Sequence, residues 1–147
     1  IWLKSLPIFF VRPFNYTGVK QSKRFLIPKI VDHFKNHKKK IELGNLDIYR
    51  DYSDVRDVTD QYAKLLIDPP IGKILNICSG KATSIRQIIN ILNKIANYEI
   101  EVIQNPEYIR DNDIKYLRGG SIVKDKKIKF INKFDIEDTL LWMYRNE

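Results

Sequence analysis

The sequence predicts an α/β fold, and three observations lead to this class. Short apolar runs and longer amphipathic stretches alternate along the chain, as strands and helices do in α/β proteins. The 147 residues are 44% hydrophobic and 12% aromatic, which is enough for a domain with its own core. No apolar run approaches the roughly 20 residues that a membrane-spanning helix needs. We therefore expect one α/β domain over residues 1–147 and no membrane partner.

Strands and helices are expected to alternate up to a polar loop and a final helix. Each expected strand is a short apolar run, and each helix repeats apolar residues at intervals of three and four. Pro13 ends the first strand and Pro69–Pro70 stops the second helix, because proline interrupts regular backbone hydrogen bonding. In chain order we expect strand 7–12, helix 24–37, strand 41–43, helix 54–67, strand 74–78, a helix from residue 85 to about 95, strand 99–103, loop 104–120 and a helix beginning near residue 135.

Capping signals mark where three of these helices start. Asp54 and Asp57 place negative charge in the first turn of the second helix, where it stabilises the helix dipole. Ser84 and Gln87 have the spacing of a capping box, in which each side chain pairs with the backbone of the other residue. The acidic segment 135–138 is expected to cap the final helix.

Charge and cysteine content narrow the class of partner. The formal net charge is +8, from 26 basic and 18 acidic residues, which suits partners that carry phosphate. Aromatic residues fall mostly at core positions, whereas a nucleic-acid-binding domain would interleave exposed aromatics with basic residues. Cys78 is the single cysteine, so an internal disulfide is excluded and a reducing compartment is favoured. We expect a cytoplasmic protein that binds no nucleic acid.

Two catalytic-looking patterns are set aside. Tyr16 and Lys20 have the spacing of a catalytic Tyr–Lys pair, but a glycine between them breaks the helix that would bring them together. His33 and His37 lie one helical turn apart, yet the basic run 38–40 would repel a metal cation. The sequence also lacks a glycine-rich dinucleotide fingerprint. We therefore expect no metal site, and neither pattern is assigned a catalytic role.

Polar residues near expected element ends are candidates for ligand binding. Asn15 follows the first strand, at the edge where α/β proteins bind ligands, and its amide can donate and accept hydrogen bonds. Arg50 precedes a helix, where a guanidinium beside helix N–H groups can hold a phosphate. Arg110, in the polar loop, is a second phosphate candidate. The alternative for Arg50 is a surface ion-pair network with neighbouring aspartates, which contributes little to stability.

Six segments together resemble the C-terminal half of the extended short-chain dehydrogenase/reductases that act on nucleotide sugars, the NAD-dependent epimerase/dehydratase family. They are most similar to the GDP-mannose 4,6-dehydratase and GDP-6-deoxy-D-mannose reductase branches. Three stretches lean towards the reductases: Leu43–Asn45, Asn76–Gly80 and Asp113–Gly119. The six segments occur in the family's order and cover nearly the whole chain: Arg12–Gly18, Phe25–Lys29, Leu43–Asn45, Arg50–Val58, Asn76–Gly80 and the segment from Arg110 to 119.

The resemblance implies both a fold and a function. The chain would contain the last Rossmann strands and a small α/β substrate-binding domain, with the N-terminal nicotinamide-binding half and its catalytic Ser/Thr, Tyr and Lys absent. It would be the GDP-sugar-binding half of a nucleotide-sugar oxidoreductase or dehydratase, foremost a GDP-4-keto-6-deoxy-D-mannose reductase. A GDP-mannose 4,6-dehydratase, another nucleotide-sugar epimerase/dehydratase and a non-catalytic nucleotide-sugar-binding module are the alternatives. The implied cofactor is NADP or NAD, bound mainly by the other half. The full-length enzyme would be a homo-oligomer, and this chain alone is expected to be inactive.

The resemblance also implies roles for individual residues. Asn15 would contact the pyrophosphate of the substrate, and the backbone of Pro13, Phe14 and Asn15 would face the nicotinamide. Arg50 and Arg110 would clamp the phosphates or the ribose. The remaining lining of the nucleotide pocket would come from Lys29, Leu43, Gly44 and Asn45.

Overall fold

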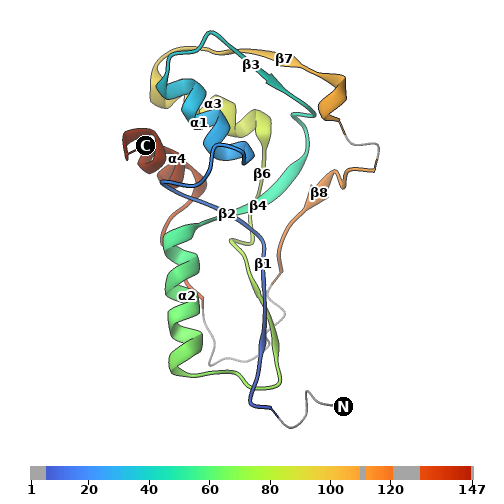
Figure 1. Cartoon of the computed structure of the whole chain (residues 1–147), viewed down its shortest axis with the longest axis vertical. Coiled ribbons are helices and arrows are strands. Elements are labelled where there is room, and N and C mark those ends of the chain that lie inside the picture. Colours follow the sequence, from blue (N-terminus) through green and yellow to red (C-terminus); the bar gives the residue numbers. More distant parts are fainter. Residues whose placement is uncertain (1–5, 110–111, 121–129, 147) are drawn as a thin grey trace.

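The computed structural model of the protein describes residues 6–109, 112–120 and 130–146, and it confirms the predicted α/β class. Figure 1 shows the chain with its elements labelled. In chain order these are β1 (Phe10–Pro13), β2 (Asn15–Thr17), α1 (Leu26–Lys35), β3 (Lys40–Leu43), β4 (Tyr49–Asp54), α2 (Val55–Ile67), β5 (Ile74–Ile77), β6 (Ala82–Ser84), α3 (Ile85–Ala96), β7 (Glu101–Gln104), the 3₁₀ turn η2 (Pro106–Tyr108), β8 (Tyr116–Leu117) and α4 (Ile136–Asn146).

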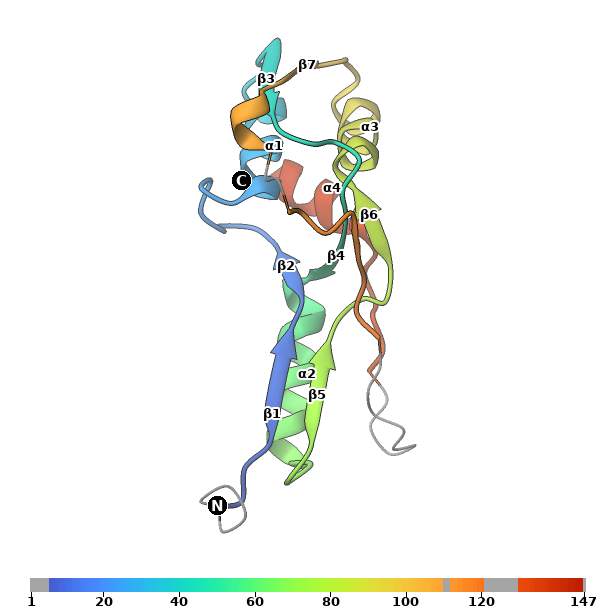
Figure 2. The same ribbon diagram turned by 90° about the vertical axis from the view of Figure 1, so that its right-hand side faces the viewer.

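One end of the elongated molecule is a parallel pair of strands, β1 and β5, backed by α2 (Figure 2). Val58 and Leu65 of α2 pack with Leu75 and Ile77 in a small core. Parallel sheets are normally buried on both faces. Here, however, Phe10 of β1 and Ile74 of β5 are 47% and 41% exposed. The described residues therefore leave apolar surface of this strand pair uncovered.

The larger core lies at the other end, where α1, α3 and α4 pack against one another (Figure 1). Each helix contributes side chains that are fully buried, among them Phe34 of α1, Leu92 of α3 and Met143 of α4. The parallel pair β3–β7 adds Ile41 and Leu43 to the same core. The apolar stripes predicted from the sequence thus meet in this three-helix cluster.

A central sheet joins the two ends, and β4 is its middle strand. It runs parallel to β2 and β8 and antiparallel to β6. The register places Asn15 beside Tyr52 and Arg50 beside Leu117. This pairing places β2, which follows β1, next to β4, which directly precedes α2.

The strand β4 is the main difference from the sequence-based prediction, which has no strand over residues 49–54. Asp51, Ser53 and Asp54 are buried although they are polar, so the segment lacks the apolar alternation that marks a strand. The strands β2, β6 and β8 are two or three residues long, which is too short for a periodic pattern. The loop predicted over residues 104–120 contains η2 and β8.

The predicted helix caps are confirmed. The Gln87 N–H donates to Ser84 Oγ at 3.1 Å, and the Ser84 N–H donates to Gln87 Oε1 at 2.8 Å, which completes the capping box of α3. The Asp138 N–H donates to Asp135 Oδ1 at 2.9 Å, and the Asp135 N–H donates back to Asp138 Oδ2 at 3.1 Å. This reciprocal pair caps the start of α4.

Asp54 caps α2 and also ties this helix to α4. Its carboxylate accepts the Arg56 N–H and two guanidinium hydrogen bonds from Arg56, and it accepts a fourth hydrogen bond from the Thr139 hydroxyl. The Arg56 guanidinium lies 3.6 Å from the ring centroid of Phe134 and 3.9 Å from a ring centroid of Trp142. Burial raises the pKa of Asp54, but the hydrogen bonds from Arg56 and Thr139 outweigh it, so the pKa lies below its ordinary value.

Replacing Asp54 with Asn keeps an oxygen that can cap α2 but removes the negative charge that accepts the two Arg56 guanidinium hydrogen bonds, so it is expected to destabilise the protein at pH 7 by about 1–2 kcal/mol. A depressed carboxyl pKa contributes stability above the unfolded-state pKa of about 3.8. This contribution is lost as the pH falls towards the folded-state pKa. The difference between wild type and variant should therefore narrow below pH 4 in urea unfolding. Asp47, which pairs with Arg86 on the surface, is the control, and Asp47→Asn should leave stability nearly unchanged. An Asp54 difference that stays constant from pH 7 to pH 3 would contradict this account.

Candidate functional site

An open cavity of about 720 Å³ lies between β2, the start of α1 and β4. It is called the β2–β4 cavity below. Three predicted site residues line it: Phe14 and Asn15, which follow β1, and Arg50, which lies on β4. Four further lining residues are used in the argument below: Phe25, Tyr52, Tyr108 and Asp113. The carboxyl end of a parallel strand is where α/β proteins place their ligands.

Asn15 reaches the cavity because the chain bends between β1 and β2. The Phe14 N–H donates to the Ile77 carbonyl at 2.8 Å, which fixes the end of β1 against β5. Asn15 then begins β2 and lies beside Tyr52 of β4. Within the described residues the Asn15 amide has no hydrogen-bond partner. Phe14 and Asn15 thus form one wall of the cavity. Pro13 is the last residue of β1 and pairs with Ile77 outside the cavity lining.

Arg50 enters the cavity from β4, and its side chain is only 15% exposed. Its guanidinium donates to the Tyr49 and Ile114 carbonyls at 2.8 and 2.6 Å and forms an ion pair with Asp113. Arg50 therefore fastens β4 to the segment that leads into β8. These contacts use three of its five N–H groups, so two have no partner among the described residues.

The helix N-terminus predicted beside Arg50 takes no part in the site. Arg50 lies on β4, five residues before α2 begins at Val55. The first-turn N–H of α2 at Arg56 is taken by the Asp54 carboxylate. Because the strand separates the guanidinium from the helix, Arg50 cannot share a phosphate with helix N–H groups there. The carboxylate that pairs with Arg50 belongs to Asp113, which is 63 residues away in the sequence, and not to the neighbouring aspartates that the alternative interpretation invoked.

The cavity lining does not include the four residues predicted for the rest of the nucleotide pocket, which are Lys29, Leu43, Gly44 and Asn45. Leu43 is 3% exposed and belongs to the large core. The Asn45 side chain accepts the Asp47 N–H at 2.9 Å and so forms the turn after β3. Lys29 donates to the Glu42 carbonyl at 3.1 Å. Arg110 falls outside the described residues.

Gly44 and Lys29 both contact Tyr108, a cavity residue that the sequence analysis missed. A Cβ at Gly44 would lie 2.6 Å from the Tyr108 carbonyl oxygen, so the two backbones approach more closely than a side chain permits. The Lys29 Nζ lies 5.5 Å from the centroid of the Tyr108 ring. An aromatic residue in a polar loop carries no periodic signal, and its contacts come from segments 64 and 79 residues away. The sequence alone therefore gave no indication of its role.

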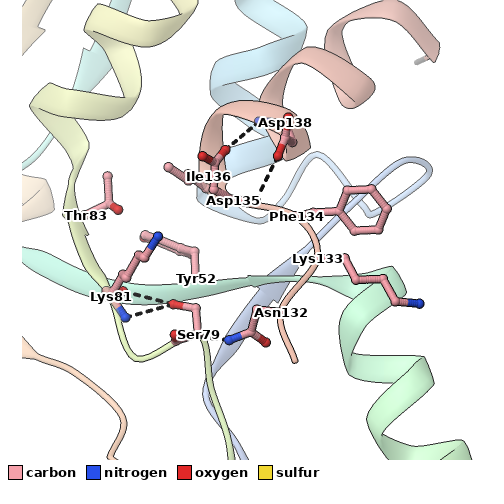
Figure 3. A pocket seen from close by; sticks show the side chains of 10 residues that line it. All are labelled: Tyr52, Ser79, Lys81, Thr83, Asn132, Lys133, Phe134, Asp135, Ile136 and Asp138. Carbon is pink, nitrogen blue, oxygen red and sulfur yellow. Dashed lines mark hydrogen bonds between the residues drawn. The ribbon is translucent and has the colours of Figure 1, made fainter. Parts of the chain in front are cut away.

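A second cavity, of about 550 Å³, lies beside the turn between β5 and β6 (Figure 3). Its polar side chains are largely satisfied by one another. Asp135 and Asp138 are paired with each other's backbone, the Ser79 hydroxyl lies 3.1 Å from the Lys81 carbonyl, and Asn132 donates to the Ser79 carbonyl at 3.1 Å. These groups hold the segment before α4 in place, and we assign this cavity a structural role.

Tyr52 borders both cavities. Burial raises the pKa of Tyr52 to about 12, so its phenol stays protonated at neutral pH. A phenol with this pKa does not act as a base near pH 7. The described residues contain no group of three or more His, Cys, Asp or Glu that could hold a metal ion. Among the same residues, no helix is both long and apolar enough to cross a membrane.

The fold is that of the extended short-chain dehydrogenase/reductases, which confirms the predicted fold family. A solved structure from Burkholderia cenocepacia J2315 is 42% identical and has a TM-score of 0.88 over 98% of this chain and 48% of that chain. The RMD protein of Pseudomonas aeruginosa, solved in complex with NADPH, is 27% identical and has a TM-score of 0.86 over 97% of this chain and 48% of that chain.

The chain belongs to the GDP-mannose 4,6 dehydratase family, whose model matches residues 3–140. It is 40% identical over 100 residues to GDP-6-deoxy-D-talose 4-dehydrogenase of Aggregatibacter actinomycetemcomitans. The aligned residues make up 68% of this chain and 34% of that protein. It is 34% identical over 108 residues to GDP-6-deoxy-D-mannose reductase of Pseudomonas aeruginosa, and these residues make up 70% of this chain and 36% of that protein. The chain thus matches about a third of the length of these curated relatives and about half of the solved ones.

Proposed function

We propose that this chain is the substrate-binding part of a GDP-sugar oxidoreductase that reduces a GDP-4-keto-6-deoxy sugar. The observation that carries the proposal is the shared cavity, where Asn15 from the end of β1 and Arg50 from β4 line one open space. The family membership and the two GDP-sugar relatives named above support the choice of ligand. The chain's task in this reaction is to bind and orient the sugar nucleotide.

The diphosphate of the ligand is assigned to Arg50 and Asn15. A guanidinium offers several N–H donors in fixed geometry, which suits the oxygens of a diphosphate. The Asn15 amide has no partner among the described residues and can donate to a phosphate oxygen. Asp113, which also lines the cavity, pairs with Arg50 and keeps the guanidinium oriented towards the same space. A bound diphosphate shares the Arg50 donors with this carboxylate.

The cofactor side of the site is assigned to the end of β1. A nicotinamide cofactor, when bound, supplies the hydride chemistry. Phe14 and Asn15 fit one wall of such a site, because they lie at the carboxyl end of a parallel strand. The uncovered apolar surface around Phe10 and Ile74 suits further α/β structure packed against β1 and β5. We assign most of the nicotinamide contacts to that additional structure.

The test is a calorimetric titration of this chain with GDP, inorganic pyrophosphate and guanosine. If the diphosphate is the main anchor, GDP should bind about tenfold or more tightly than guanosine, and pyrophosphate should also bind. Raising the salt concentration should weaken GDP binding, because the contact is charged. Equal affinities for GDP and guanosine, or no binding of GDP at millimolar concentrations, would refute the proposal.

A further inference from the structure

Two aromatic side chains of the β2–β4 cavity are more than half exposed. Tyr108 is 54% exposed and Phe25 is 58% exposed, although both line the cavity. Large aromatic surfaces that stay in contact with water at a cavity are characteristic of sites that a ligand covers. The polar residues Asn15 and Arg50 contribute a different part of the same lining. The cavity therefore offers both a charged region and an aromatic region.

The backbone of Tyr108 is held by the turn η2 and by β3. The Asn105 side chain accepts the Glu107 N–H at 3.0 Å, and the Asn105 N–H donates to the Leu43 carbonyl at 2.8 Å. Gly44 follows Leu43 in the sequence. A Cβ at Gly44 would clash with the Tyr108 carbonyl, so the close contact between the two backbones requires glycine. These contacts hold the Tyr108 backbone, from which the half-exposed ring extends.

Lys29 is the polar neighbour of the ring. Its ammonium group is anchored on the Glu42 carbonyl and lies 5.5 Å from the ring centroid, within the range of a cation–π contact. This contact restrains the ring without covering the surface that stays exposed. An aromatic ring fixed in this way loses little conformational freedom when a planar group stacks on it.

We propose that Tyr108 stacks on the base of the bound nucleotide, with Phe25 as a second aromatic wall and with Gly44 and Lys29 as positioning residues. The inference rests on the proposed function and extends it, because it assigns the base to one region of the cavity and the diphosphate to another. Stacking of a base on an aromatic side chain changes affinity by about tenfold. Gly44 and Lys29, which do not line the cavity, thereby acquire a role through Tyr108.

The experiment compares GDP with inorganic pyrophosphate, which lacks the base. For Tyr108→Ala we expect GDP affinity to fall about tenfold while pyrophosphate affinity changes less than twofold. Tyr108→Phe keeps the ring and should retain GDP affinity. If Tyr108→Ala binds GDP like the wild type, or loses affinity for both ligands equally, the stacking role is wrong. If the wild-type chain binds neither ligand, the proposed function itself fails.

A pair of glycine variants tests the positioning role. A methyl group at Gly44 would clash with the Tyr108 carbonyl, whereas a Cβ at Gly120 would meet no atom within 4 Å. Gly44→Ala should therefore show the same selective loss of GDP affinity, and Gly120→Ala should bind like the wild type. Circular dichroism checks that both variants are folded. The Tyr108 variants leave the backbone unchanged, so their result stands even if Gly44→Ala does not fold.

Discussion

Replacing Asp51 with alanine is expected to lower the free energy of unfolding by about 3–4 kcal/mol, a large part of the stability of a small domain. Asp51 lies on β4 and is completely buried. One carboxylate oxygen accepts the Ser79 N–H and hydroxyl at 2.8 and 2.6 Å, and the other accepts the N–H groups of Gly80 and Gly119 at 2.9 and 3.0 Å. This single side chain therefore connects β4 to the turn after β5 and to the segment that follows β8.

The expected loss of stability is large because the variant leaves several hydrogen-bond donors without an acceptor at once. Alanine would leave three backbone N–H groups without the acceptor they have in the wild type, and a buried unpaired donor costs about 1–3 kcal/mol. Urea unfolding at pH 7 measures the effect. Asp60, whose carboxylate pairs with Lys133 at the surface, provides the control, and Asp60→Ala should be nearly neutral. If Asp51→Ala unfolds within 1 kcal/mol of the wild type, then Asp51 does not organise these loops.

Replacing Arg50 with alanine is expected to weaken GDP binding by about 30- to 100-fold, which corresponds to roughly 2–3 kcal/mol for charged hydrogen bonds to a diphosphate. Arg50 is the one described arginine that lines the β2–β4 cavity. Calorimetric titration with GDP measures the loss, and the same loss is expected for pyrophosphate. Arg50→Lys should recover part of the affinity, because it keeps the charge but not the planar array of donors.

Arg86 is a matched control for the loss of an arginine. It makes two hydrogen bonds to Asp47 on the surface, where its side chain is 54% exposed, and it does not line the β2–β4 cavity. Arg86→Ala should bind GDP like the wild type. Arg50 also holds two backbone carbonyls, so unfolding curves are needed to show that Arg50→Ala is folded during the titration. An affinity within threefold of the wild type would remove Arg50 from the site.

The helices could be predicted from the sequence because their signals are local. Apolar spacing located α1 to α4, and the Ser84–Gln87 box and the cap at Asp54 lie within four residues of the helix starts that they fix. The strand β4 could not be predicted in the same way. Its buried residue Asp51 is stabilised by Ser79, Gly80 and Gly119, which are 28 to 68 residues away. Nothing in the local sequence shows that these partners are present.

The candidate site was predicted in part, and for a similar reason. Asn15 and Arg50 belong to polar segments whose chemistry suits a phosphate, and the pairing of β2 with β4 brings them to one cavity. The helix N-terminus expected beside Arg50 lies beyond the end of β4, because the segment is extended and not helical. Gly44 looks like an ordinary turn residue in the sequence. Its close approach to Tyr108 depends on the pairing of β3 with β7, which brings η2 back over the turn.

The central claim is that the β2–β4 cavity receives the nucleotide part of the substrate. The most direct test is an NMR titration of the isotope-labelled chain with GDP, in which each shifted signal is assigned to a residue. The account predicts shifts at Asn15, Arg50 and Tyr108, with residues of the second cavity that do not pair with β4, such as Lys133 and Asp138, unchanged. Shifts confined to the second cavity, with Asn15, Arg50 and Tyr108 unaffected at saturation, would contradict it.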